Sequence, residues 1–161
     1  MELQEQLKLE AINLGACEEG IASWGEPTID DLCLKYFKYQ DFCIKHDFPS
    51  VDVIKQLDQD VLRENGIYAS GTGESCEKKE IAVIGDANVT IHVTKPCSIT
   101  VRHRGTVRVS VDSDVLCYIS MYDESKVSLV KTEPNGRIAV SFWGGKIKNK
   151  KMVDKIYYKE K

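Results

Sequence analysis

The sequence predicts an α+β protein in which an N-terminal three-helix module is followed by a repetitive β region, best explained as a short β-solenoid. Three observations lead to this prediction. Residues 2–65 contain three stretches with apolar residues at helical spacing, and residues 89–143 contain six short runs in which apolar and polar residues alternate. Similar residues also recur at a separation of twenty, as is typical of stacked coils.

Residues 1–68 are predicted as the helical module. The first amphipathic helix is expected over residues 2–24, and Gly15 weakens its middle enough that it could divide into two. A second, more apolar helix begins after Thr28, which can cap its N-terminus while Asp31 occupies the third helical position.

A third helix is expected after the turn at Pro49, because Ser50 can cap it and Gly66 supplies a C-terminal stop. Three short helices of this length have a small core, so we expect the module to pack on another surface. Residues 69–76, ASGTGESC, are rich in Gly and Ser and are predicted to be a linker.

Residues 77–145 are predicted as the repetitive β domain, with two strands in each coil. An antiparallel meander or sandwich remains the alternative, because a strand and a tight turn also occupy about ten residues. The identity at twenty favours the solenoid. The matched pairs are Cys97 and Cys117, Ile99 and Ile119, Val101 and Met121, Val107 and Val127, and Val109 and Leu129.

The Lys-rich residues 146–161 are predicted as a final short strand or tail. A solenoid must protect its exposed end, and the EPNG insertion with the following FWGG corner is where we expect the last coil to close.

Charge is divided between the two halves of the chain. Residues 1–76 hold 15 acidic and 6 basic residues, whereas residues 77–161 hold 10 acidic and 16 basic residues. The basic half could attract an anionic ligand or the acidic half of a neighbouring subunit. The alternative is that the Lys-rich tail is simply a solvated end.

The VRHRG segment predicts a ligand-binding surface. Arg102 and Arg104 alternate with the inward Val101, so both are expected to point outward and could hold phosphate groups. The alternative is that these polar residues are ordinary outward-facing strand residues that pair with nearby acids. The candidate ligand-binding residues are Arg102, Arg104, Arg108, His92, Tyr118 and Tyr122.

No catalytic, metal-binding or cofactor motif occurs, so we expect no enzyme activity, no metal and no cofactor. No two of the six cysteines form a C-x-x-C pair, which predicts free and mostly buried thiols. No apolar run is long enough for a membrane span and the N-terminus is acidic, so we expect a cytoplasmic protein without a membrane partner. With a net charge of -3, nucleic acid is not an expected partner.

Five segments of the chain carry a resemblance to other proteins: AINLGACEEG with Trp24, DFCIKHDFPS, ENGIY, ITVRHRG and YISMYDESKVSLV. They resemble small uncharacterised proteins of gut Bacteroidetes and their phages or mobile elements. The resemblance implies the same order of a helical head and short β repeats, and a binder, inhibitor or particle component rather than an enzyme. It implies no substrate and no site residue.

The charge distribution and the candidate basic surface predict a non-enzymatic, homo-oligomeric binding protein that sequesters an anionic small molecule such as a nucleotide. The resemblance implies that it is encoded by a phage. The alternative is a structural or protein-interaction module of a larger assembly, whose contacts would depend on apolar residues rather than on a ligand.

Overall fold

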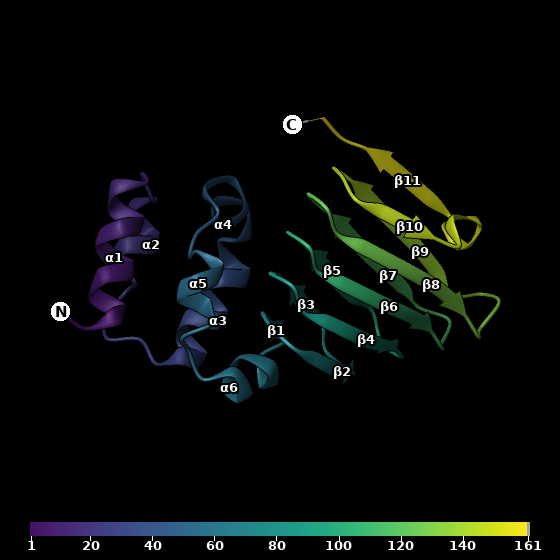
Figure 1. Cartoon of the computed structure of the whole chain (residues 1–161), viewed down its shortest axis with the longest axis horizontal. Coiled ribbons are helices and arrows are strands. Elements are labelled where there is room, and N and C mark those ends of the chain that lie inside the picture. Colours follow the sequence, from purple (N-terminus) through teal and green to yellow (C-terminus); the bar gives the residue numbers. More distant parts are fainter. Residues whose placement is uncertain (161) are drawn as a thin grey trace. The chain divides into compact units, whose positions relative to one another are not determined.

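The computed structural model describes residues 1–160, apart from the side chain of Cys76 (Figure 1). The chain divides into two compact units, a helical unit, Met1–Asn65, and a β unit, Gly66–Lys161. The α+β class predicted from the sequence is confirmed, with helices in the first unit and parallel strands in the second.

Residues 1–65 form six short helices, where three longer ones were predicted. Each expected helix is divided in two by a local break: Gly15 has a φ of 83° and separates the first pair, and Tyr39, with a φ of -113° and a ψ of 32°, separates the second. Asp58 starts the last helix by accepting hydrogen bonds from two backbone N–H groups. The helices are α1 (Leu3–Asn13), α2 (Glu18–Ala22), α3 (Ile29–Lys38), α4 (Gln40–His46), α5 (Val51–Ile54) and α6 (Gln59–Glu64).

The two N-caps predicted from the sequence are confirmed. The Thr28 hydroxyl accepts a hydrogen bond from the Asp31 N–H at 3.2 Å, and the Asp31 carboxylate accepts one from the Thr28 N–H at 2.9 Å. The Ser50 hydroxyl accepts a hydrogen bond from the Val53 N–H in the same way. These bonds satisfy donors that a helix N-terminus otherwise leaves unpaired.

The β unit is a solenoid in which the chain alternates between two parallel sheets. Sheet A has the strand order β1-β3-β5-β7-β9-β11, and sheet B has the order β10-β8-β6-β4-β2. Figure 1 shows the strands stacked in sequence order from β1 to β11. The strands are β1 (Ile67–Tyr68), β2 (Thr72–Cys76), β3 (Glu80–Val83), β4 (Asn88–Val93), β5 (Cys97–Val101), β6 (Thr106–Val111), β7 (Leu116–Met121), β8 (Lys126–Lys131), β9 (Arg137–Phe142), β10 (Lys146–Lys148) and β11 (Lys155–Tyr158).

The twenty-residue repeat is the register of this stack. Every pair matched in the sequence is a pair of neighbouring residues on parallel strands, and the antiparallel alternative is therefore wrong. Their side chains point inward and are almost completely buried, because each coil covers the apolar residues of the coil before it. The matched pairs are Cys97 and Cys117, Ile99 and Ile119, Val101 and Met121, Val107 and Val127, and Val109 and Leu129.

The solenoid begins earlier than predicted, so the prediction of a linker over residues 69–76 is wrong. Strand β2 lies within that stretch and pairs with β4. Strand β1 lies in the part that was predicted as the helical module, and it pairs with β3. The glycines that suggested a linker have structural roles. Gly71 turns the corner with a φ of 69°, and a Cβ at Gly73 would lie 2.8 Å from the Tyr68 ring.

The solenoid also continues further than predicted. Of the two forms predicted for the Lys-rich residues, the structure has the strand and not the tail, because β10 pairs with β8 and β11 pairs with β9. The expected closure at the FWGG corner is therefore wrong. A 3₁₀ turn, Lys150–Met152, joins the last two strands, and Ile147 and Ile156 add to the core from partly buried positions.

Among the described residues, no helix has both the length and the apolar character that a membrane crossing requires.

Candidate functional site

Each coil passes from sheet A to sheet B through a short corner, and these corners stack on one another. We call the stacked segments 84–87, 102–105, 122–125 and 143–145 the A–B corner. Gly85, His103 and Asp123 are equivalent residues of three corners and have φ values of 63°, 55° and 56°. His and Asp are among the non-Gly residues that adopt this left-handed conformation most readily.

Side chains tie successive corners together. The Gly85 N–H donates a hydrogen bond to Nδ1 of His103 at 3.1 Å, and the His103 N–H donates one to the Asp123 carboxylate at 2.9 Å. His103 and Asp123 therefore each bind the backbone of the preceding corner through their side chains. Arg104 and Glu124 follow these two residues immediately, so the bonds help to position them in the A–B corner, just before the sheet B strands begin.

The outer face of sheet B carries a group of basic side chains. Inward Val127 and Ile147 alternate with outward Lys126, Lys146 and Lys148, so the lysines point away from the core. Lys126 and Lys146 are direct register partners, and neighbouring parallel strands lie about 4.8 Å apart. Like charges in such positions repel one another, which destabilises the free protein unless an anion lies between them.

Among the described residues, no ion pair involves the Lys and Arg side chains on or beside the outer face of sheet B. Elsewhere in the solenoid Lys131 binds Asp154 at 2.7 Å and Lys95 lies 3.9 Å from Glu77, so basic residues in other places do have acidic partners. We call the following five side chains the basic group: Arg104, Arg108, Lys126, Lys146 and Lys148.

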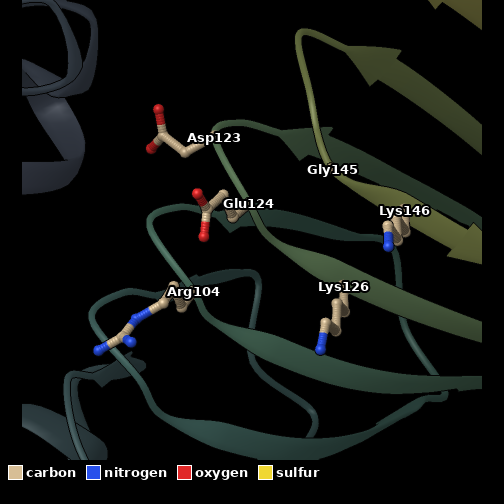
Figure 2. A pocket seen from close by; sticks show the side chains of 6 residues that line it. All are labelled: Arg104, Asp123, Glu124, Lys126, Gly145 and Lys146. Atoms are coloured by element: carbon tan, nitrogen blue, oxygen red, sulfur yellow. The ribbon is translucent and has the colours of Figure 1, made fainter.

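A pocket of about 390 Å³ lies where the A–B corner meets sheet B (Figure 2). Its three cations, Arg104, Lys126 and Lys146, come from three successive coils. Figure 2 shows Lys126 and Lys146 side by side on neighbouring strands. Two carboxylates lie on the corner side, but one of them, Asp123, is already hydrogen bonded to the His103 N–H. The lining residues are Arg104, Asp123, Glu124, Lys126, Gly145 and Lys146.

The structure does not bring the six predicted site residues onto one surface. Arg104 lines the pocket, and Arg108 and His92 lie on the outer face of sheet B. The prediction that Arg102 points outward is wrong, because it is only 4% exposed. The chain leaves β5 after Val101, so the strand alternation from which the outward direction was inferred does not apply to residues 102–105.

The two predicted tyrosines lie elsewhere. Tyr118 is on the outer face of sheet A, where its hydroxyl shares a hydrogen bond with the Ser141 hydroxyl. Tyr122 is in the A–B corner, where its ring stacks on that of Trp143 with centroids 5.8 Å apart. Of these two tyrosines, only Tyr122 is close in sequence to residues that line the pocket.

His92 lies between two carboxylates of neighbouring coils. Its Nε2 lies 2.8 Å from the Glu74 carboxylate, and its Nδ1 lies 3.4 Å from the Asp112 carboxylate. Both ring nitrogens therefore face acids of the preceding and following coils. Within the described residues, no cluster of His, Cys, Asp and Glu side chains is arranged to hold a metal ion.

Asp112 gives this region a testable pH dependence. Hydrogen bonds from the Ser110 hydroxyl, then from Thr132 and His92, hold the pKa of Asp112 below its ordinary value of 3.8. A depressed pKa means that the carboxylate stabilises the folded state above pH 3.8, and that this contribution is lost as the pH falls through the folded-state pKa. We expect Asp112→Asn to lower the free energy of unfolding at pH 7 by about 1 kcal/mol.

Urea unfolding of the wild type and of Asp112→Asn at several pH values tests this expectation. The difference between them should shrink as the pH falls from 3.8 through the folded-state pKa, because the wild-type carboxyl becomes neutral over that range. Asp114→Asn is the control, since Asp114 is exposed and two residues away. A difference that stays constant down to low pH would contradict the proposed role of the charge.

The described cysteines are free, as predicted, and Cys76 lies outside the described side chains. Four of the five are buried, and burial raises the pKa of Cys33 and of Cys97 to about 11 and that of Cys117 still further. At neutral pH these buried thiols are protonated, so they are weak nucleophiles and metal ligands.

Sequence reasoning missed most of the pocket. Lys126 and Lys146 were not selected, although the same twenty-residue separation that predicted the core also places them side by side. Nothing in the sequence linked Glu124 and Gly145 to a pocket, because their positions depend on how the corners stack. No protein-family model, no curated protein and no solved structure matches the chain.

Proposed function

We propose that the chain is a non-enzymatic binding protein that sequesters an anionic small molecule, such as a nucleotide, in the pocket between the A–B corner and sheet B. The observation that carries the proposal is the register pairing of Lys126 with Lys146, next to Arg104. An anionic group between these cations would relieve their mutual repulsion and accept charge-assisted hydrogen bonds from more than one of them.

The net charge of the β unit supports the same proposal. Residues 66–161 hold 16 basic and 11 acidic residues, whereas residues 1–65 hold 6 basic and 14 acidic residues. The field of the β unit therefore attracts anions, and we expect binding at these exposed side chains to weaken as salt is added. Arg108 and Lys148 lie on the same face and extend the basic surface beyond the pocket.

We expect the double variant Lys126→Ala/Lys146→Ala to bind inorganic phosphate and adenosine monophosphate roughly 100-fold more weakly than the wild type at low ionic strength. Removing two charge-assisted hydrogen bonds, each worth about 1.5–3 kcal/mol before discounting for exposure, accounts for a change of this size. Isothermal titration calorimetry with each anion measures it.

The matched control is Lys95→Ala/Lys155→Ala, which removes the same charge from the β unit. Lys95 is in a corner on the opposite side of the coil and Lys155 is on sheet A, so neither lines the pocket. Equal affinities of the wild type and the Lys126/Lys146 variant would contradict the proposal. Equal losses in both double variants would show that net charge alone causes the attraction.

A structural or protein-interaction module is the second candidate, and the last coil supports it. Strands β10 and β11 stand at the ends of their sheets, and the inward residues of this coil are less buried than their equivalents in earlier coils. An unpaired edge over a partly exposed core favours pairing with another chain. Self-association through this coil would make the protein a homo-oligomer.

Native mass spectrometry of the purified protein separates the two candidates. A ligand-sized additional mass that is lost on unfolding would favour sequestration. A discrete oligomer without additional mass would favour the interaction module.

A further inference from the structure

We propose that the stacked rings of Tyr122 and Trp143 bind the planar ring of a ligand whose phosphate group occupies the pocket, so that the ligand class is a nucleotide. This inference rests on the proposed function, because it assigns a second part to the same binding site. Trp143 was not among the candidate ligand-binding residues selected from the sequence.

The first argument is the geometry of the two rings. Their centroids are 5.8 Å apart and their planes differ by only 13°, so they lie nearly parallel in successive corners. The backbone sets this arrangement, since the Tyr122 N–H donates to the Val101 carbonyl and the Trp143 N–H donates to the Met121 carbonyl. Both side chains are partly exposed, and together they present aromatic surface at the corner.

The second argument is the distance along the chain between the rings and the pocket. Tyr122 precedes Glu124 by two residues, and Trp143 precedes Gly145 by two residues. Two residues of extended chain span at most about 7 Å, so each aromatic residue has its Cα within about 7 Å of a residue that lines the pocket. The rings and the pocket therefore belong to the same stretch of the A–B corner, and the proposed ligand spans from one to the other.

The third argument is the chemistry of the groups that meet at this corner. Lys and Arg bind phosphate, and aromatic rings bind planar bases by stacking, with little preference for the base. The carboxylate of Glu124, which lies in the pocket beside the cations, can accept hydrogen bonds from sugar hydroxyl groups. A nucleotide carries all three groups, whereas inorganic phosphate and sugar phosphates lack the planar base.

The test compares adenosine monophosphate with ribose 5-phosphate in the full-length protein. We expect the nucleotide to bind the wild type roughly 10- to 100-fold more tightly than the sugar phosphate, as expected for one stacked base. Trp143→Leu should remove this preference without changing the affinity for ribose 5-phosphate, and Trp143→Phe should restore part of it. The nucleotide should also quench tryptophan emission in the wild type but not in Trp143→Leu, where only Trp24 of the helical unit remains.

Tyr157→Leu is the matched control, because Tyr157 is an exposed aromatic residue on β11 of sheet A. It should leave the preference for the nucleotide unchanged. Equal affinities for the two ligands in the wild type, or an unchanged preference in Trp143→Leu, would overturn the assignment of the rings while leaving phosphate binding by Lys126 and Lys146 intact. Absence of binding for both compounds would overturn this inference and the proposed function together.

Discussion

Replacing Ile119 by Ala is expected to lower the free energy of unfolding of the β unit by about 2–5 kcal/mol, the range measured for comparable core truncations. Ile119 is completely buried in β7, between its register partners Ile99 and Val140. Both neighbouring strands are fixed by their own hydrogen bonds, so the core cannot easily close around the space that the shorter side chain leaves.

Urea unfolding followed by the β-sheet circular dichroism signal measures this loss. The control is Ser120→Ala in the same strand, where the side chain points outward and the expected change is below about 0.5 kcal/mol. If Ile119→Ala costs less than about 1 kcal/mol, the coils do not pack as tightly as the structure indicates.

Gly145→Ala is expected to destabilise the last coil by about 2–5 kcal/mol and to weaken anion binding at the same time. Gly145 has a φ of 102°, and a Cβ there would lie 2.4 Å from the Ser125 carbonyl oxygen. That oxygen accepts the hydrogen bond of the Lys146 N–H, so the added methyl group would displace the backbone that positions Lys146. The estimate combines the strain of a non-Gly residue at positive φ with that of overpacking.

Gly15→Ala separates the two contributions. Gly15 also has a positive φ, of 83°, but a Cβ there would meet no atom within 4 Å. This control should lower the free energy of unfolding by about 1 kcal/mol, which is the conformational strain of a non-Gly residue at positive φ without overpacking. Hydrogen exchange of the β10 amides and calorimetry with inorganic phosphate give the two readouts for Gly145→Ala. Equal effects of the two substitutions would mean that the contact with Ser125 is not decisive.

The sequence predicted the solenoid because its core repeats in a regular way. A parallel stack places equivalent residues of successive coils in direct contact. Ile99 and Ile119 are neighbours in space for this reason, and the length of one coil separates them by twenty residues in the chain. The two ends of the solenoid were harder to predict. At one end glycines gave β2 the composition of a linker, and at the other the many lysines left a solvated tail as the alternative to a final short strand.

The division of the helices also depended on single backbone positions. Apolar periodicity runs through Tyr39 without interruption, yet the backbone there is not helical and α3 ends. Periodicity reports which face of a segment is buried, and it does not report where the hydrogen bonds between turns are broken.

The candidate site was predicted only in part, since the chain changes direction inside the segment that suggested it. Arg102 and Arg104 are two residues apart and would share a face in a strand, but they lie in a corner, where Arg102 is buried and Arg104 lines the pocket. Lys126 and Lys146 are far apart in the sequence and adjacent in space.

The sequence by itself determined the class of fold, the inward residues and their register, because these follow from alternation and from a repeat that can be counted. The tertiary structure alone decided the composition of the pocket. Its residues come from three successive coils. Their approach depends on the left-handed backbone conformation at His103 and Asp123, which the alternation of apolar and polar residues does not predict.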